Sequence, residues 1–237
     1  MILPFRAFAA LATTVSVLFG SWGYALPQDD PQGLLLLVNK EYRAPDVQPV
    51  LVLPDVTPTK PAYAENIYMR PEAAAALEAL FQAAQDAGHT LYATSGYRSY
   101  ATQKAIYERR TGEIGTARAS MLVAEPGHSE HQTGLAMDID GESTLYDGLE
   151  ESFGASPEGV WVAQNAHRFG FIIRYKRGWE EITGYAYEPW HLRYVGVEHA
   201  TAIAQLNIPL EWYVDLLQEE RAQTLSSDMQ ADEADLT

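Results

Sequence analysis

The stretch PGHSEHQTGLAMDI, residues 126–139, decides how this chain of 237 residues can fold around a reactive centre. It places the imidazole of His131 seven residues before the carboxylate of Asp138. Seven residues cover about 10 Å along a helix and more than about 20 Å along a strand, so the two side chains can meet only if the chain reverses between them. Gly134 can adopt the backbone angles of a tight reversal, and the LAMDI that follows predicts a strand that delivers Asp138.

A histidine and an aspartate brought together in this way are candidate ligands of one metal ion. A third ligand is needed, and His191 in the stretch EPWHLRY, residues 188–194, is the strongest candidate. Two histidines and one carboxylate leave a fourth coordination position open, which is typical of a hydrolytic rather than a structural zinc. His128 lies three residues before His131 and stays open as an alternative ligand. The chain has no cysteine, so thiolate metal sites and cysteine nucleophiles are excluded.

Two further charged residues complete the candidate site. Glu188 stands three residues before His191, and because Pro189 discourages a helix, we predict an extended or bent segment that keeps Glu188 near the metal without binding it. Its expected role is that of a general base and then of a general acid toward the leaving amine. Arg98, in SGYRSYATQ, is expected either to stabilise charge on a carbonyl oxygen or to hold a substrate carboxylate. The remaining histidines are expected to be surface or packing residues: His89, His167 and His199.

The rest of the chain mixes predicted strands and helices. Apolar residues recur at helical spacing between Pro71 and Gly88, which predicts an amphipathic helix. No regular alternation of strand, helix and strand is present, so the predicted fold class is α+β, a mostly antiparallel sheet with helices packed against it. The patterns predict short strands at 34–38, 50–53, 90–94 and 171–175, and further helices at about 100–110, 160–170, 197–206 and 210–220.

Composition divides the chain into three segments. The N-terminus has Arg6, an apolar run to about residue 20 and small residues near Ala25, which predicts a secretory signal peptide over residues 1–25. The run is marginal for a bilayer, which takes about 20 residues, so a retained N-terminal membrane anchor is the alternative. Either interpretation places the folded domain, residues 34–220, outside the cytoplasm, in the periplasm, the extracellular space or the cell envelope. Residues 221–237 are predicted to form an acidic, disordered tail.

The charge balance limits the possible partners. The formal charge of -16 argues against nucleic acid, because binding phosphates needs clustered lysine and arginine. Residues 211–237 hold eight acidic residues with Arg221 as the only basic one, so part of this charge lies at the C-terminal end. A solvated tail explains that bias better than an acidic interaction motif.

Three stretches together resemble a known family. SGYRSYATQ, PGHSEHQTGLAMDI and TGYAYEPWHLRYVG are similar to the zinc D-alanyl-D-alanine carboxypeptidases of the VanY type, and the resemblance runs over about residues 34–207. The wider group includes D-Ala-D-Ala dipeptidases and shares its zinc-binding fold with the Hedgehog signalling domain. The family pattern S-x-H-x-x-G-x-A-x-D is matched at every fixed position, by Ser129, His131, Gly134, Ala136 and Asp138.

The resemblance implies a role for each candidate residue. One Zn²⁺ per chain would be bound by His131, Asp138 and His191, with Glu188 as the catalytic base. Arg98 would contact the substrate or the tetrahedral intermediate. The pocket for the terminal D-alanine would be lined by Gln103, Ser129 and Tyr175. The implied partner is the stem peptide of peptidoglycan, a cell-wall substrate that agrees with an export signal.

Other activities remain open at this point. An L,D-carboxypeptidase that removes D-alanine from a tetrapeptide stem would use the same zinc chemistry. A dipeptidase acting on free D-Ala-D-Ala is less favoured, since no extra acidic group is assigned to hold a free amino terminus. A non-catalytic module that keeps zinc and binds wall peptides is a rival from another class, although a pure binding module has no need for Glu188. The sequence leaves the oligomeric state open.

Overall fold

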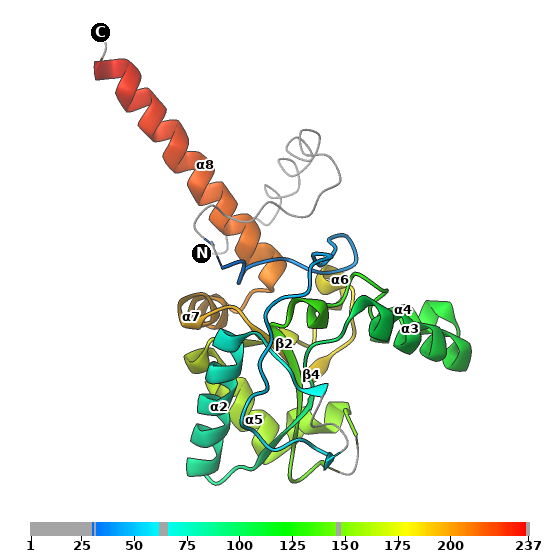
Figure 1. Ribbon diagram of the computed structural model, residues 1–237. Helices are drawn as coiled ribbons and strands as arrows, with labels where there is room; N and C mark the ends of the chain where they lie inside the picture. Colours follow the sequence, from blue (N-terminus) through cyan, green and yellow to red (C-terminus); the bar gives the residue numbers. More distant parts are fainter. Residues whose placement is uncertain (1–29, 31, 62–65, 146–147, 236–237) are drawn as a thin grey trace.

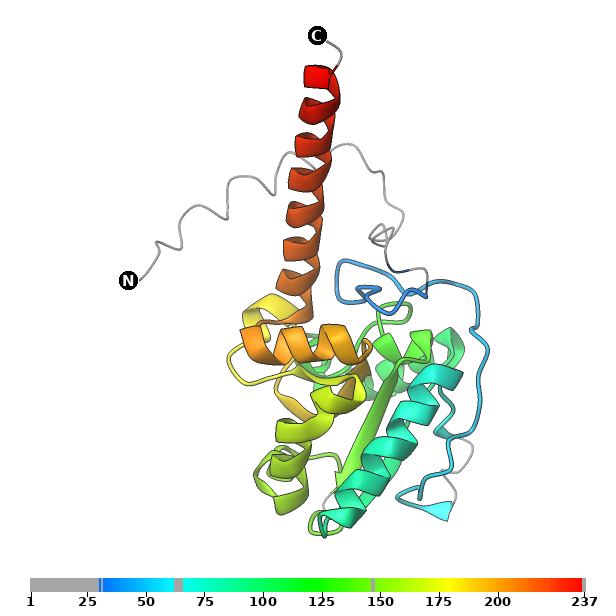
Figure 2. The same ribbon diagram turned by 90° about the vertical axis from the view of Figure 1, so that its left-hand side faces the viewer.

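The computed structural model describes residues 30, 32–61, 66–145 and 148–235 (Figures 1 and 2). The export signal expected at residues 1–25 lies outside the described residues. A four-stranded sheet forms the centre of the domain, with strands in the order β1-β2-β4-β3 and every neighbouring pair antiparallel. The predicted α+β class with an antiparallel sheet is confirmed. The strands are β1 (Leu91–Ser95), β2 (Ala136–Gly141), β3 (Phe171–Tyr175) and β4 (Glu188–Tyr194).

Helices cover the sheet from both sides. Helices α2 and α5 pack on one face of the sheet with Phe171 and Ile173 of β3, whereas α7 and the start of α8 pack with Ile172 on the other face. In Figure 1, α3 and α4 lie to the right of the strands and α8 extends away from the body of the domain. Among the predicted helices, α5 starts earlier than expected because the hydroxyl of Ser156 accepts a hydrogen bond from the backbone of Gly159 at 3.0 Å and caps it. The α-helices are α2 (Pro71–Asp86), α3 (Tyr100–Ile114), α4 (Thr116–Leu122), α5 (Pro157–Asn165), α6 (Glu180–Thr183), α7 (Val197–Leu206) and α8 (Leu210–Asp235). Short 3₁₀ helices are η2 (Glu130–Thr133), η3 (Glu151–Ala155) and η4 (Ala166–Phe169).

Alternation along the strands separates the core from the reactive face of the sheet. Met137 and Ile139 of β2 are fully buried and belong to the main hydrophobic core with the apolar face of α2. Because successive side chains of a strand point to opposite faces, Asp138 lies on the other face. The same alternation in β4 buries Leu192 in this core and leaves His191 on the face of Asp138. Along β2 and β4, the sheet therefore supplies packing on one face and polar side chains on the other.

Two of the predicted strands are not strands. Residues 34–38 are irregular, although Leu35 and Leu37 are buried in a second core with α7 and the start of α8. Side chains take the place of a partner strand there: Asp30 accepts hydrogen bonds from the backbone of Leu34 and Leu35 at 2.8 and 2.6 Å, and Arg193 donates to the carbonyls of residues 34 and 36. The apolar run was therefore a correct signal of burial and a wrong signal of strand pairing.

The stretch at residues 50–53 contributes one isolated bridge, between Val52 and Met69. Pro49 and Pro54 flank it, and proline cannot donate a ladder hydrogen bond, so pairing does not extend. Val50 is 76% exposed, which shows that this apolar run is not a buried strand.

The C-terminal segment also differs from its prediction. Helix α8 begins at Leu210 and continues to Asp235, through the segment from Arg221 that was expected to be disordered. This segment contains three alanines and two glutamines together with leucine, methionine and arginine, all residues of high helix propensity, although it also holds three aspartates. Across the described ranges of the chain, no helix combines the length and the apolar character needed to cross a membrane.

Candidate metal centre and active site

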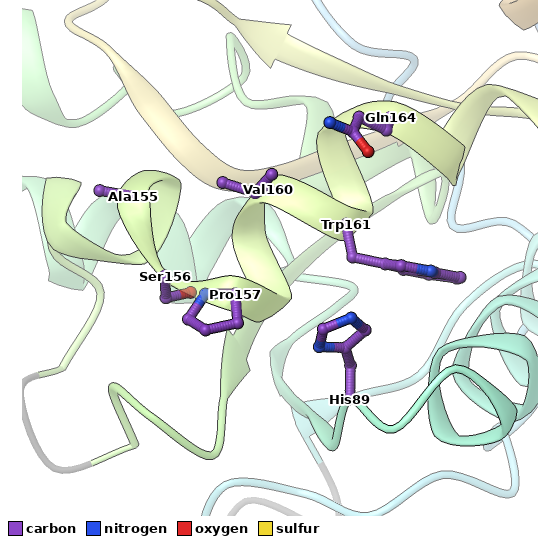
Figure 3. A pocket seen from close by; sticks show the side chains of 7 residues that line it. All are labelled: His89, Ala155, Ser156, Pro157, Val160, Trp161 and Gln164. Atoms are coloured by element: carbon purple, nitrogen blue, oxygen red, sulfur yellow. The ribbon is translucent and has the colours of Figure 1, made fainter.

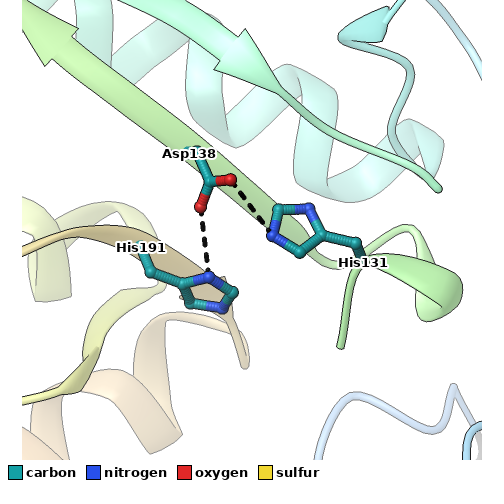
Figure 4. Close-up of side chains that lie close together, drawn as sticks. All are labelled: His131, Asp138 and His191. Atoms are coloured by element: carbon teal, nitrogen blue, oxygen red, sulfur yellow. Dashed lines mark ion pairs between the residues drawn. The ribbon is translucent and has the colours of Figure 1, made fainter. Parts of the chain in front are cut away.

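Three side chains from distant parts of the sequence converge on the polar face of the sheet. One ligand atom each from His131, Asp138 and His191 lie within 4.8 Å of one another, and all three residues are buried. Figure 4 shows the carboxylate of Asp138 between the two imidazoles, with Oδ2 at 3.3 Å from Nε2 of His131 and Oδ1 at 3.2 Å from Nδ1 of His191. The structure thus brings the three predicted ligands together.

The local backbone explains this convergence. His131 lies in the 3₁₀ turn η2, which ends at Gly134 with φ of 72°, in the left-handed region. The chain reverses there and enters β2, as the spacing of the two residues required. Asp138 of β2 is then paired directly opposite His191 of β4 in the antiparallel register. Residues directly opposite in such a pair have neighbouring side chains on one face, so the register brings the third ligand to the first two.

Each imidazole has a different partner on its outer nitrogen. Nδ1 of His131 lies 2.7 Å from the carbonyl oxygen of Gly96, so Nδ1–H donates and Nε2 faces Asp138. Burial, assisted by the charge of Arg98, lowers the pKa of His131 to about 4, which keeps this imidazole neutral. His191 is placed the other way round, with Nδ1 facing Asp138 and Nε2 lying 3.2 Å from Oε2 of Glu130.

The donor atoms suit a divalent cation. Oδ1 of Asp138 is buried and accepts no hydrogen bond, an arrangement that is costly unless a cation satisfies it. Nη2 of Arg98 lies 2.6 Å from Nε2 of His131 and 2.7 Å from Oδ2 of Asp138, so these lone pairs already face a positive charge. Two imidazole nitrogens and one carboxylate form a three-ligand set of the kind found in catalytic zinc sites. Among the described residues, this is the one group of histidine and acidic side chains with that geometry.

Glu188 lies beside the ligands and remains separate from them. Its Oε2 is 3.9 Å from Nδ1 of His191, and its side chain is 12% exposed. The residue starts β4 in extended backbone, as Pro189 predicted. Burial raises the pKa of the Glu188 carboxyl to about 7, a change that Asp138 reinforces and His191 opposes. A carboxylate with such a pKa can accept a proton near neutral pH, and a nearby divalent cation would lower the value again.

Arg98 is held by several hydrogen bonds at the edge of the same centre. Besides its contacts with the ligands, Nε donates to the hydroxyl of Ser95 at 3.0 Å and Nη1 donates to Oε1 of Gln103 at 3.2 Å. Gln103, buried on α3, in turn donates to the carbonyl of Ala124 at 2.8 Å. These bonds fix the orientation of the Arg98 guanidinium at the edge of the pocket.

A pocket of about 200 Å³ opens over this centre. Its lining includes every residue that the sequence predicted for the site, together with Tyr185, Trp190 and Glu130, which were not assigned a role. The hydroxyl of Tyr185 is buried without a hydrogen-bond partner, and burial raises the pKa of this phenol. The predicted residues that line it are Arg98, Gln103, Ser129, His131, Asp138, Tyr175, Glu188 and His191.

A larger hollow of about 350 Å³ lies elsewhere, along α5 (Figure 3). Its reactive side chain is the imidazole of His89, which faces Trp161 with ring centroids 6.0 Å apart. The lining contains no carboxylate, so it offers neither a metal-binding set nor a base. This hollow is the larger of the two, but the smaller pocket contains the side chains that could bind a metal and transfer a proton.

The other histidines do not join the ligand group. Nδ1 of His128 lies 2.8 Å from the carbonyl oxygen of Asn39, and the converging group consists of His131, Asp138 and His191 without His128. Nδ1 of His199 lies 2.9 Å from the hydroxyl of Tyr213. His167 lies in η4, away from the converging side chains.

Glu130 is a buried charged residue in the lining of the smaller pocket that the sequence did not single out. It occupies a variable position of the S-x-H-x-x-G-x-A-x-D pattern, so the motif does not point to it. A different signal was present: Arg174 and Arg193 interrupt the otherwise apolar stretches FIIRY and HLRYV. A buried guanidinium needs a carboxylate partner, and both of these arginines bond to Glu130.

Comparison with known proteins agrees with this geometry. Residues 66–197 match the family model VanY, described as D-alanyl-D-alanine carboxypeptidase. The protein YodJ of Bacillus subtilis is 47% identical over 188 residues, which cover 78% of this chain and 68% of YodJ. A solved structure of the LD-carboxypeptidase LdcB is 46% identical with a TM-score of 0.73, covering 78% of this chain and 87% of LdcB. A D,D-pentapeptidase VanY from a VanB-type vancomycin resistance cassette, solved with Zn(II), is 33% identical with a TM-score of 0.64, covering 76% and 98% of the two chains.

An antiparallel sheet that presents two histidines, an aspartate and an adjacent glutamate in one pocket is typical of a hydrolytic metal enzyme. The chain belongs to the VanY family of D-alanyl-D-alanine carboxypeptidases.

Proposed function

We propose that the protein is a zinc carboxypeptidase that hydrolyses the C-terminal D-alanine from peptidoglycan stem peptides. The observation that carries this proposal is the convergence of His131, Asp138 and His191 beside Glu188 in one pocket. The family description and the Zn(II) in the VanY structure support both the reaction and the metal.

The metal would be held by Nε2 of His131, a carboxylate oxygen of Asp138 and Nδ1 of His191, the three atoms that face one another. When bound there, zinc supplies a Lewis acid that polarises the scissile carbonyl group. The buried and otherwise unpartnered Oδ1 of Asp138 would gain the partner it lacks. The neutral state of His131 keeps a lone pair available for this purpose.

Glu188 is assigned the proton transfers. Its carboxylate lies close to the ligands, at 3.9 Å from His191, and its own backbone bonds in β4 hold it there. It accepts a proton from the attacking water and returns a proton to the leaving amine of D-alanine. Tyr175 of β3 is paired with Glu188 of β4, so the proposed base and this residue of the pocket wall are held by the same pair of strands.

Arg98 and its neighbours are assigned to the substrate. The guanidinium can donate to the carbonyl oxygen as negative charge develops or to the terminal carboxylate, and its hydrogen bond to Gln103 orients it for either task. Gln103, Ser129 and Tyr175 line the pocket beside it and are proposed to contact the terminal D-alanine.

An L,D-carboxypeptidase is the second candidate, and a specific observation favours it. The LD-carboxypeptidase LdcB is more similar to this chain than the D,D-pentapeptidase VanY is, with 46% against 33% identity and TM-scores of 0.73 against 0.64. An L,D- and a D,D-carboxypeptidase differ in the configuration of the residue that precedes the terminal D-residue.

A digest of two stem peptides tests the proposal. Purified zinc-loaded protein is incubated with a pentapeptide ending in D-Ala-D-Ala and with a tetrapeptide ending in one D-alanine, and products are identified by mass. Loss of one alanine from the pentapeptide supports the D,D activity, and shortening of the tetrapeptide alone supports the L,D activity. A pentapeptide ending in L-Ala-L-Ala controls for general peptidase activity, which would contradict the assignment.

A zinc-containing binding module is distinguished by the same assay. It would bind both peptides and shorten neither. Glu188 argues against this function, because a pure binding site gains nothing from an acid buried beside the metal with a raised pKa.

The proposed enzyme acts at the cell envelope. A substrate in the cell wall requires export, which agrees with the signal peptide or membrane anchor proposed for residues 1–25. We assign the catalytic domain to residues 34–220, with residues 221–237 as an appendage outside the reaction. Fractionation of cells followed by N-terminal sequencing of the mature protein separates a cleaved signal from a retained anchor.

A further inference from the structure

Glu130 is the centre of a buried ionic network directly behind the metal ligands. The residue is 1% exposed, and the two arginines that contact it are fully buried. Its Oε1 accepts hydrogen bonds from Nε of Arg174 at 2.8 Å and from Nη1 of Arg193 at 2.7 Å. Its other oxygen, Oε2, lies 3.2 Å from Nε2 of His191. The carboxylate therefore has one oxygen bound to two cations and one oxygen aimed at a metal ligand.

The rest of the network balances the charge of the arginines. Arg174 also donates to both oxygens of Glu211, at 2.9 and 2.5 Å, and Glu211 accepts from the side chain of Asn39 at 3.2 Å. Arg193 donates to the backbone carbonyls of Leu34 and Leu36. Two buried positive charges thus face two carboxylates. Glu130 and Glu211 share the same electrostatic role toward Arg174, but the bond to His191 belongs to Glu130.

The bond to His191 selects which imidazole nitrogen carries the proton. A neutral imidazole has one N–H and one lone pair. Glu130 is held ionised by two guanidinium groups and offers an acceptor, so Nε2 keeps the proton and donates it to Oε2. When a metal ion takes the place of a proton on Nδ1, the lone pair used for it is on the nitrogen that faces Oδ1 of Asp138, at 3.2 Å. His131 has the opposite arrangement, with its Nδ1–H on the carbonyl of Gly96.

We propose that Glu130 is a positioning residue of the metal centre, which holds His191 in the Nε2–H form and orients its Nδ1 toward the metal. This inference rests on the proposed zinc enzyme and adds a residue that acts through a metal ligand, His191. A carboxylate behind a ligating histidine fixes its orientation and increases its basicity, and loss of such a partner lowers metal affinity by about 10–100-fold. Arg174 and Arg193 hold the Glu130 carboxylate in place.

The variant Glu130→Gln tests the proposal because the shape of the side chain is retained. An amide has one oxygen and one NH₂ group, and the two arginine donors require the oxygen at the position of Oε1. The NH₂ group then faces Nε2 of His191 and donates to it, which moves the imidazole proton to Nδ1. A protonated Nδ1 cannot bind zinc. We expect zinc affinity, measured by competition with a chromophoric chelator, to fall by about 10–100-fold.

Glu211→Gln is the matched control. It removes one negative charge from the same network and weakens the hydrogen bonding of Arg174. The bond between Glu130 and His191 stays in place. Its zinc affinity is expected to equal that of the wild type. Unchanged affinity in Glu130→Gln, or an equal loss in both variants, would overturn the proposal, because the effect would then not pass through His191.

A spectroscopic measurement on the wild type does not depend on the folding of any variant. Long-range ¹H–¹⁵N correlation spectra of the zinc-loaded protein are expected to show His191 with a protonated Nε2 and a metal-bound Nδ1, and His131 with the reverse pattern. Binding of zinc through Nε2 of His191 would refute the proposal. Neither measurement uses a substrate, so Glu130-dependent zinc binding in a protein that leaves stem peptides intact would reject the proposed function and preserve this inference.

Discussion

Replacing Gly134 by alanine tests the turn that joins His131 and Asp138, two of the proposed metal ligands. Gly134 has φ of 72°, and an added Cβ would lie 3.0 Å from Cδ2 of Leu51, 3.2 Å from Cγ of Arg70 and 3.3 Å from Cγ of Pro49. The substitution therefore strains the backbone and crowds three side chains at the same time. Since the turn separates η2 from β2, both effects act between His131 and Asp138.

The loss of stability expected for Gly134→Ala has two parts, backbone strain and crowding. A left-handed conformation costs about 1–2 kcal/mol for a residue with a Cβ. Crowding adds about 1 kcal/mol, the lower end of the range for overpacking, because the three contacted side chains are only half-buried and can shift. The sum of about 2–3 kcal/mol corresponds to a melting temperature lower by roughly 4–12 °C for a chain of this size.

Thermal unfolding followed by circular dichroism measures this loss, with Gly88→Ala as the matched control. Gly88 has φ of 85° and nothing within 4 Å of an added Cβ, so its variant should lose only the backbone contribution of about 1–2 kcal/mol. Gly134→Ala should also bind zinc more weakly, whereas Gly88→Ala should not. This account of the turn would be refuted if Gly134→Ala had the same melting temperature as Gly88→Ala and bound zinc as tightly as the wild type.

Three further predictions concern the reaction. Glu188→Gln should lower turnover of the stem peptide by roughly 10²–10⁴-fold while zinc content, measured by atomic emission, stays at the wild-type level; substantial turnover in this variant would contradict its role as the base. Arg98→Ala should lower kcat by about 10²–10³-fold if the guanidinium stabilises the developing oxyanion, and steady-state kinetics that show a raised KM alone would assign it to the substrate carboxylate instead. Removal of zinc by a chelator should abolish activity until zinc is restored. Penicillin should have no effect, because the mechanism has no nucleophilic hydroxyl to acylate. Activity in the zinc-free protein, or inhibition by penicillin, would contradict the mechanism.

Much of the site could be predicted because its chemistry depends on short stretches. The spacing of His131 and Asp138 demanded a reversal, and the glycine between them could make it. Pro189 predicted an extended segment around Glu188, and β4 begins there. Each of these inferences depends on the backbone angles that glycine or proline allows within a few residues, and these limits can be read from the sequence.

Predictions that required long-range contacts were less successful. The run at 34–38 was correctly apolar, but its backbone groups bond to Asp30 and Arg193 instead of a neighbouring strand. The arginine lies more than 150 residues away in the chain. Periodicity reports which side chains are buried and says nothing about which groups satisfy the backbone.

By itself, the sequence determined the kinds of atoms at this centre: two imidazoles, two carboxylates, a guanidinium, no thiol, and a glycine where the chain must turn. The tertiary structure decided how they are connected. The register of β2 against β4 placed Asp138 opposite His191, and the burial of Arg174 and Arg193 brought Glu130 behind that imidazole. The physical reason is that coordination chemistry is a property of a side chain, whereas strand register and the partner of a buried charge depend on the whole folded chain.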